Sequence, residues 1–198
     1  MDRPQASALH ARALMEGRGG RETPPELPEL ADAAMLRAKL WANPCWFSFR
    51  LNYLSLHFNN PVYGFITARL DLQRPDFAVL WSLHVGGDGT LTEVVQSSGF
   101  PKNTLSRAAN KLARLNLISR EVDPADQRRV TLSLTAAGRD AIAAVQDQMI
   151  AQERRMLETL SPSERLMLSD ILTKLVAASE SWPETIDGAG TAEDDAGR

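Results

Sequence analysis

The basic side chains of this sequence are concentrated between residues 99 and 129, where they could bind phosphate groups. This segment holds seven Lys or Arg and three Asp or Glu, a net charge of +4, although the 198-residue chain has a formal net charge of −3. Nucleic acids are recognised by a local basic surface rather than by total charge. The basic residues are Lys102, Arg107, Lys111, Arg114, Arg120, Arg128 and Arg129. A solvated helix face followed by a turn is the other interpretation of these charges.

The first half of the basic segment predicts a helix that carries its charges on one face. Its apolar residues recur at helical spacing and are Leu105, Ala108, Ala109, Leu112 and Leu115. The positions left on the outside are Lys102, Asn103, Ser106, Arg107, Asn110 and Lys111. A shorter helix precedes it, with Thr92 as its expected N-cap and Gly99 at its end. A helix of this kind has the width to enter the major groove of DNA.

The second half of the segment predicts a β-hairpin with arginines at its tip. "LISREV" is the first strand, and in "RRVTLSL" apolar and polar residues alternate, which is typical of a half-buried strand. The tip between them is "DPADQRR". An arginine presented there could enter the narrow minor groove. Two short helices followed by such a hairpin form a winged helix-turn-helix, so the predicted fold class is mainly α with one small β-hairpin.

At these motifs the sequence resembles the MarR-type transcriptional regulators. The wing motif of that family stands here as Asp126, Arg128 and "LTAAG" at 134–138. "RPDFAVLWSL" resembles the helix before the motif, and "LTEVVQSSGFPKNTLSRAANKLARLNLISR" resembles the helix-turn-helix. The resemblance covers about residues 45–180. It departs from the family at Pro101, which replaces a small polar cap, and at Gln127 and Asn116.

The resemblance implies a homodimer that binds a pseudo-palindromic site in double-stranded DNA. Carried over by position, the groove-facing residues are Lys102, Asn103, Thr104, Ser106 and Arg107. Arg128 would be the wing arginine, and Asp126 would hold it in place through a charge-assisted hydrogen bond. Lys111 and Arg129 are further expected DNA contacts.

The domain organisation follows from these elements. We expect an arm that is partly flexible over 1–43, a winged-helix domain over 44–182 and a disordered acidic tail over 183–198. Within the domain we expect the helix-turn-helix at about 91–116, the wing at about 118–134 and dimerisation helices at about 44–72 and 135–182. Pro61 should kink or split the first of these helices, and Ser161 with Glu164 predicts a capping box.

Two stripes of aromatic and polar side chains suggest a site for a flat ligand. The first stripe consists of Trp46, Arg50, Tyr53 and His57, and the second of Phe77, Trp81 and His84. Each set lies on one face of a helix. Members of the resembled family bind small molecules near these helices, so we expect a small aromatic carboxylate or phenol with Arg50 on its acid group. The other interpretation is that both stripes are core and dimer interface.

Two further classes of function remain open. Some members of the family sense peroxide with a lone cysteine near the start of this helix, where Cys45 stands, although a small apolar packing role is common for such a residue. A helical module that binds only protein would not need the basic helix and wing.

Other classes find no support in the sequence. With one cysteine, and three histidines far apart, no metal-ligand spacing is present, and no phosphate loop, dinucleotide fingerprint or nucleophile motif occurs. We therefore expect no metal, no cofactor and no catalytic residues. No apolar run reaches the length of a membrane span or a signal peptide, which predicts a cytoplasmic protein without membrane contact.

Overall fold

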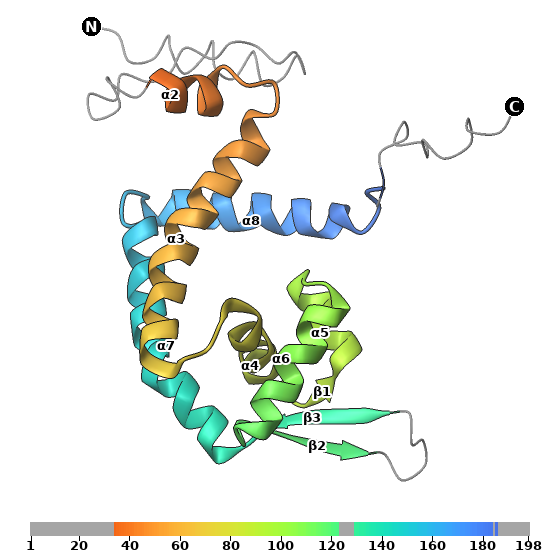
Figure 1. Ribbon diagram of the computed structural model, residues 1–198. Helices are drawn as coiled ribbons and strands as arrows, with labels where there is room; N and C mark the ends of the chain where they lie inside the picture. The colour runs from red at the N-terminus through yellow and green to blue at the C-terminus, as the bar shows by residue number, and fades with distance from the viewer. Residues whose placement is uncertain (1–33, 123–128, 184, 186–198) are drawn as a thin grey trace, which may run out of the picture. The chain divides into compact units, whose positions relative to one another are not determined.

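The computed structural model describes residues 34–122, 129–183 and 185. The elements of this part of the chain are α2 (Ala34–Trp41), α3 (Trp46–Leu70), α4 (Arg74–Gly86), β1 (Gly89–Thr90), α5 (Leu91–Ser98), α6 (Lys102–Arg114), β2 (Ile118–Val122), β3 (Val130–Leu134), α7 (Ala136–Leu157) and α8 (Pro162–Ser179). Figure 1 shows the strands beside α4, α5 and α6. The predicted fold class, mainly helical with a winged helix-turn-helix, is confirmed.

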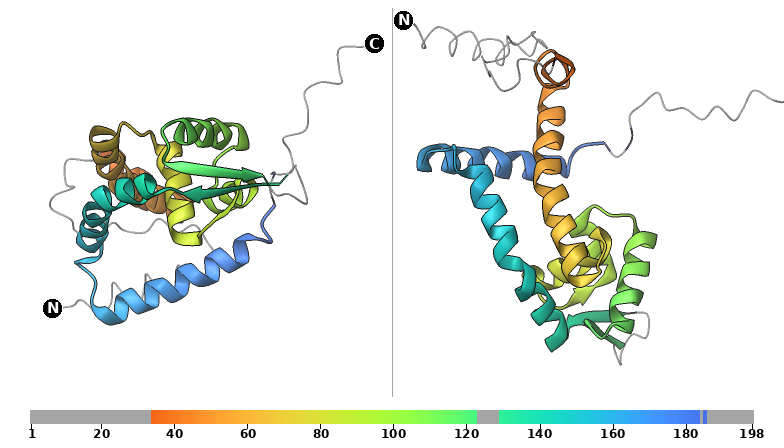
Figure 2. Two further views of the ribbon diagram at one scale, coloured as in Figure 1. Left: turned by 90° about the horizontal axis from the view of Figure 1, so that it is seen from below. Right: turned by 60° about the vertical axis from the view of Figure 1, so that its left-hand side comes forward.

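The predicted hairpin is the larger part of a three-stranded antiparallel sheet in the order β1-β3-β2. β2 and β3 pair from Ile118 opposite Leu134 to Val122 opposite Val130, and β1 adds Gly89 and Thr90 to the other edge of β3. Figure 2 shows this sheet from two further sides. β1 is not predicted from the sequence, because two residues are too few to show an alternating pattern.

Of the two outcomes expected at Pro61, a kink or a split of the helix, the split does not occur, since α3 is one helix of 25 residues with Pro61 inside it. A proline lacks the N–H that would donate to the carbonyl four residues earlier, here that of His57. In the structure the Gln152 side-chain amide of α7 donates to the His57 oxygen at 3.3 Å. Tertiary packing thus replaces the hydrogen bond that Pro61 removes, and the helix continues.

The core lies where α4, α6, the sheet and α7 meet. α4 and α6 pack their apolar faces together, and the fully buried side chains include Phe77, Leu80, Leu105, Leu112, Leu132, Ile142 and Val145. Burying one such side chain contributes about 1.5–3 kcal/mol. Because Leu105 and Leu112 face inward, the opposite face of α6 is held toward solvent.

Helix caps follow the predicted chemistry with one shift in position. Ser161 and Glu164 form the expected capping box at α8. At α5 the cap is Thr90, and not Thr92 as the sequence suggested, because Glu93 is the third helical residue and bonds back to Thr90. The Thr90 backbone N–H and hydroxyl donate to the Glu93 carboxylate and hold its pKa below the usual value.

The chain divides into two units, one ending at Gln152 and one beginning at Glu153. The second unit contains the end of α7 and α8, and α8 has no buried residue. Its exposed large apolar side chains are Leu166, Met167, Leu168, Ile171, Leu172 and Val176. Of the arm expected over 1–43, residues 1–33 lie outside the described part, and of the acidic tail only Pro183 and Thr185 are described.

Candidate nucleic-acid interface

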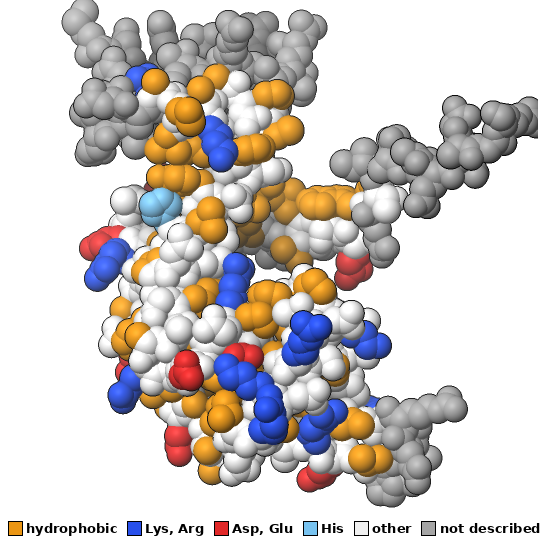
Figure 3. Space-filling model, in the orientation of Figure 1, with side chains coloured by type: hydrophobic (Ala, Val, Ile, Leu, Met, Phe, Trp, Pro, Cys, Tyr) orange, Lys and Arg blue, Asp and Glu red, His pale blue; other side chains and the backbone are white. Residues whose placement is uncertain are grey.

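Helix α6 presents a polar, basic face from its first turn onward. Lys102, Asn103 and Arg107 are exposed, whereas Thr104 and Ser106 are half-buried beside the inward-facing Leu105. Exposed Asn110 and Arg114 continue the same face. Several Lys and Arg side chains gather over this part of the molecule (Figure 3). The five residues expected to start the groove contact therefore lie together at one helix end.

The N-terminus of α6 is open to an anion. Pro101 is the N-cap, with its carbonyl accepting from the Thr104 and Leu105 N–H groups, and it supplies no side-chain cap. No acid occurs in the first turn, in contrast to Asp76, Glu93 and Glu164 at the starts of α4, α5 and α8. The positive end of the helix dipole and the N–H groups at the start of the helix favour a phosphate.

The wing is joined to α6 by a contact that the sequence did not single out. Arg120 on β2 donates through Nη1 to the Asn110 side-chain oxygen at 2.5 Å. Arg114 Nε donates to the Asn110 backbone oxygen at 3.4 Å. Arg129, directly before β3, is exposed and makes a small contribution to the lowered pKa of Glu93. The remaining predicted wing residues, Asp126 and Arg128, lie outside the described residues.

The "LTAAG" motif ties the wing to α7. Asn116 adopts the left-handed conformation, with φ 56°, as an Asn in place of the usual Gly can. The Thr135 hydroxyl donates to the Asn116 carbonyl at 2.7 Å and accepts from the Gly138 N–H at 3.0 Å. A Cβ at Gly138 would lie 2.1 Å from the Leu117 carbonyl oxygen, so this position has no space for any side chain.

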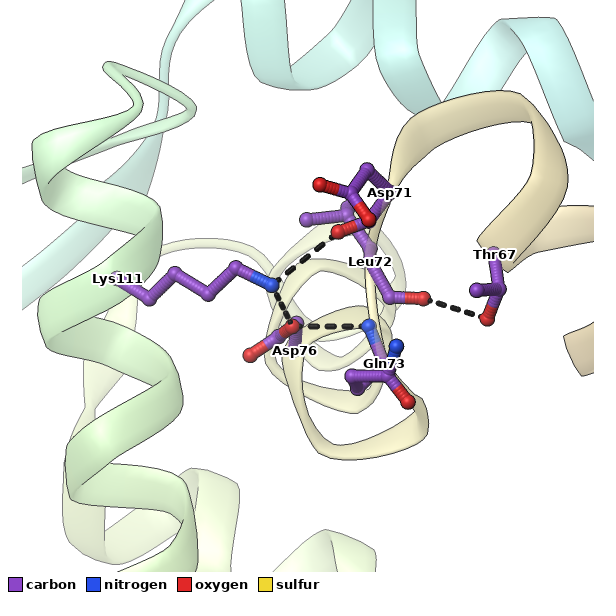
Figure 4. Close-up of polar contacts among 6 residues, drawn as sticks. All are labelled: Thr67, Asp71, Leu72, Gln73, Asp76 and Lys111. Carbon is purple, nitrogen blue, oxygen red and sulfur yellow. Dashed lines mark hydrogen bonds and ion pairs between the residues drawn. The ribbon is translucent and has the colours of Figure 1, made fainter.

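Lys111 is not on the open face with the other basic residues. Its ammonium lies 2.7 Å from Asp76 Oδ2 on α4 and also donates to the Asp71 carbonyl at 3.2 Å (Figure 4). Its side chain is 33% exposed and that of Asp76 only 8%. This predicted DNA contact is therefore half-buried and is paired within the protein.

The two aromatic stripes form ring contacts within each stripe. The rings of Tyr53 and His57 are tilted by 54° to each other, with centroids 4.4 Å apart, and the Arg50 guanidinium lies over Trp46. On α4 the described contacts are Phe77–Trp81 at 5.9 Å and Trp81–His84 at 5.3 Å.

The ring contact between α3 and α4 joins Tyr63 and Phe77, with centroids 6.4 Å apart. Tyr63 was missed because it does not continue the spacing of three and four residues that defines the first stripe. Arg50 also lies over Trp41 of α2, at 5.1 Å, and its Nε donates to the Leu40 carbonyl at 2.8 Å.

Two hollows border these helices. One of about 430 Å³ lies at the end of α4 and is lined by Trp81, Val85, Asp88, Glu93 and Ser97 among others. The other, of about 190 Å³, lies between α3 and α7 beside Phe65, Met149 and Gln152. Neither hollow is lined by both stripes, so the site expected between them is not formed by either.

Comparisons with known proteins show which family this region resembles. Residues 70–129, from the end of α3 to the wing, match the family model described as MarR family. Over this segment the chain is similar to the MarR family. This segment includes α4, α5, α6 and β2, which carry the interface described above.

Relatives of known sequence agree with this assignment. The helix-turn-helix-type transcriptional regulator YxaD of Bacillus subtilis is 29% identical over 105 residues, which are 53% of this chain and 73% of the relative. The helix-turn-helix-type transcriptional repressor NicR of Pseudomonas putida is 27% identical over 109 residues, 53% of this chain and 66% of NicR.

Solved structures show the same fold. A MarR-family transcriptional regulator from Silicibacter pomeroyi superposes with a TM-score of 0.63 at 25% identity, covering 81% of this chain and 99% of that one. Bordetella bronchiseptica BpsR, whose DNA binding is regulated by 6-hydroxynicotinic acid, has a TM-score of 0.52 at 22% identity, covering 64% and 98%. The MarR-family fold thus extends beyond the matched segment.

Two other kinds of site do not occur among the described residues. No cluster of three or more His, Cys, Asp or Glu residues that could hold a metal ion is found among them. No helix in this part of the chain has the length and apolar character needed to cross a membrane.

Proposed function

We propose that this MarR-family protein is a repressor that binds a pseudo-palindromic DNA operator as a homodimer and is released by a small aromatic acid or phenol. The observation that carries the proposal is the exposed basic face of α6, with an open N-terminus, beside a basic hairpin. Lys102, Asn103 and Arg107 would contact the major groove, with Thr104 and Ser106 beside them. Arg128 and Arg129 would reach the backbone and minor groove, and Asp126 would position Arg128.

The dimer supplies the second recognition helix. MarR-family proteins are dimeric, and a two-fold pair of winged helices reads two half-sites about one helical turn apart. In this chain the exposed apolar side chains of α8 and of α3, such as Leu54 and Leu172, support burial against a second copy. An apolar surface of this kind is costly to leave in water.

The DNA-binding part is tested by titrating labelled duplexes, taken from the region upstream of the protein's own gene, at several salt concentrations. Lys102→Ala should weaken binding to all sequences and reduce the slope of log affinity against log salt by about 1. Arg128→Ala should cost about 1–3 kcal/mol of binding free energy. Arg154→Ala, an exposed arginine outside the segment, is the control. A wild-type protein that shifts no DNA would favour the protein-only module instead.

The proposed effector class is supported by the aromatic stripes and by relatives. BpsR responds to 6-hydroxynicotinic acid, a small aromatic acid. In this chain, the Arg50 guanidinium bordered by the indoles of Trp41 and Trp46 suits a planar carboxylate, and Phe77, Trp81 and His84 offer a second aromatic surface. Tyr53 and His57 lie on the same helix as Arg50. Release requires that the effector bind the DNA-free conformation more tightly.

The effector part is tested with 6-hydroxynicotinic acid and benzoic acid as probes. Saturating acid should raise the melting temperature and loosen operator binding about 5–150-fold. Arg50→Ala should abolish this response and spare DNA binding, and Trp81→Ala should weaken the response. Trp182→Ala, an exposed tryptophan outside both stripes, is the matched control. A normal response of the Arg50 variant to both acids would refute the assignment.

A second candidate is peroxide sensing by Cys45, which is exposed at the start of α3. We expect Cys45→Ser to leave DNA binding and its response unchanged. If peroxide releases the wild-type protein from DNA while the Ser variant stays bound, the thiol is the sensor.

A further inference from the structure

We propose that Asp76 and Lys111 are a positioning pair that fixes how the recognition helix α6 is presented to DNA. The inference rests on the proposed DNA-binding function and gives Lys111 a role other than that of a phosphate contact. Asp76 lies in the first turn of α4 and Lys111 in the last turn of α6, so the pair joins two helices that are distant in sequence. Figure 4 shows the lysine reaching across from one helix to the other.

Asp76 is buried and hydrogen-bonded, as expected for a residue with a structural role. As a whole residue Asp76 is 5% exposed, and it is the one charged residue that is buried in the part of the chain that the structure describes. Its Oδ2 accepts from both the Lys111 ammonium at 2.7 Å and the Gln73 N–H at 2.9 Å. Removing one partner of a buried, hydrogen-bonded pair leaves the other charge without compensation, which is strongly unfavourable. The Lys111 ammonium is therefore held in the ion pair with Asp76.

The pair holds α6 against the junction of α3 and α4. Asp71, whose carbonyl accepts the second Lys111 hydrogen bond, is the C-cap of α3 in the left-handed conformation, with φ 55°. The Thr67 hydroxyl of α3 donates to the Leu72 carbonyl at 2.9 Å and fixes the same junction. A displacement of this junction would therefore move the attachment point of α6.

The beginning of α6 is attached to the same junction by a second contact. The Arg74 guanidinium, in the first residue of α4, lies over the rings of Tyr63 at 5.2 Å and Phe100 at 5.6 Å. Phe100 directly precedes Pro101 and α6. Both ends of the recognition helix are thus held by residues 71–76, and the ion pair sets the position of its last turns.

The direction in which one substitution changes DNA affinity separates a positioning role of Asp76 from the effect of its charge alone. Asp76→Asn removes a negative charge close to the DNA-binding helix. If charge alone mattered, this change would strengthen binding to DNA. If Asp76 positions α6, the same change weakens operator binding, because α6 loses its anchor. Asp76→Glu keeps the charge and displaces the carboxylate, so only a positioning role predicts that it lowers affinity.

The experiment measures operator affinity and its salt dependence for full-length Asp76→Asn, Asp76→Glu, Lys111→Gln and the Asp76→Asn/Lys111→Gln double variant. The probes are the upstream duplex and an unrelated duplex of equal length. Melting temperatures are measured first, and binding is titrated well below them. We expect each single variant to bind the operator about fivefold or more weakly, with an unchanged salt slope. The double variant should be no weaker than the weaker single one, since both remove the same link.

Lys102→Gln is the control that separates the two proposals, because it should flatten the salt slope. If the wild type does not bind DNA, or if Lys102→Gln leaves the salt slope unchanged, the proposed function fails. If both behave as expected, two results would overturn the positioning pair: a flattened slope for Lys111→Gln, or unchanged or tighter binding for both Asp76 variants. Should Asp76→Asn fail to fold, the charge-preserving Asp76→Glu variant decides.

Discussion

At the scale of single residues, Gly138 shows how steric contact determines one residue of a short motif. It lies in the first turn of α7, where the Leu117 carbonyl passes close to its Cα, and a Cβ would lie 2.1 Å from that oxygen and 3.2 Å from Leu134 Cδ2. The same carbonyl accepts the Thr135 N–H at 3.1 Å, so it is not free to move. Only a glycine lets the wing strand and α7 meet in this way.

Gly138→Ala should therefore destabilise the protein. Overpacking of this kind costs about 1–3 kcal/mol or more, because the backbone at Leu117 must shift. Gly64→Ala is the matched control: Gly64 lies inside α3, and a Cβ added there would meet nothing within 4 Å, so this change should stabilise the helix by about 0.5–1 kcal/mol. Denaturant unfolding of both variants measures the difference. Equal stability of the two would show that the contact at Leu117 is relaxed in solution.

Thr90 is the second residue whose role can be isolated. Its hydroxyl accepts from the Glu93 N–H at 3.3 Å and donates to the Glu93 carboxylate at 2.8 Å. Thr90→Ala should cost about 1 kcal/mol of unfolding free energy. Thr92→Ala, the exposed position that sequence alone favoured as the cap, should change it by less than about 0.5 kcal/mol. Thermal unfolding of the pair decides which threonine caps α5.

The same cap gives a pH dependence with a defined sign. The pKa of Glu93 is lowered in the folded protein, first by the Thr90 N–H and then by its hydroxyl. Because the pKa is lower in the folded protein, the ionised carboxylate stabilises the fold at any pH above the pKa of the unfolded chain. This contribution is lost as the pH falls through the pKa of the folded protein. Glu93→Gln should therefore reduce the loss of stability in acid, measured against Glu153→Gln as an exposed control.

At the scale of elements, the periodicity of apolar residues predicted the elements that have one buried face. The buried face of α6, with Leu105 and Leu112, and the alternation of β3 were both visible in the sequence. β1 was not visible, because a two-residue strand has no period. The exposed face of α6 was predicted correctly at Lys102 and Arg107, but the partner of Lys111 was not, since Asp76 lies 35 residues away and only the packing of α4 on α6 brings them together.

Pro61 shows how a tertiary contact overrides a local rule. The His57 carbonyl, deprived of a donor by Pro61, accepts from Gln152 on α7. Gln152→Met keeps the length of the side chain and removes the donor, so it should cost about 0.5–1.5 kcal/mol. In a Pro61→Ala background the backbone N–H returns, and the same substitution should cost less.

A double-mutant cycle in urea measures this coupling. Gln148→Met, on the same hollow between α3 and α7, is the control and should cost the same in both backgrounds. Additive effects of Pro61→Ala and Gln152→Met would show that the glutamine does not replace the helical donor.

At the scale of the whole molecule, the exposed apolar side chains support the proposed dimer. α8 buries no residue, and Leu166, Ile171 and Val176 are 74%, 46% and 69% exposed. Side chains of this type belong to a core or an interface, and a run of them on one helix marks a partner surface. The aromatic stripe of α3 near Trp46 was interpreted from sequence either as a ligand site or as core and dimer interface, and exposed Phe47, Phe49 and Leu51 on that helix suit a subunit interface. Sequence alone could not separate these uses, because a partner chain decides them.

Dimer formation through α8 gives a prediction that joins assembly to DNA binding. Ile171→Glu places a charge in the proposed interface, and its burial would be costly, so the dimer should dissociate. Ser169→Glu, a polar exposed position on the same helix, adds the same charge and is the control. Light scattering after gel filtration measures the mass of each variant.

The proposed dimer should also set the affinity for the operator. Two linked recognition helices bind two half-sites with an effective concentration that a monomer lacks, and such linkage is worth about 10²–10⁴-fold in affinity. Ile171→Glu should therefore lose most of its affinity for a full palindromic duplex and retain its weak affinity for a duplex with one half-site. Ser169→Glu should keep both. A monomeric Ile171 variant that still binds the full duplex tightly would show that the subunits read DNA independently, and a dimeric one would place the interface elsewhere than on α8.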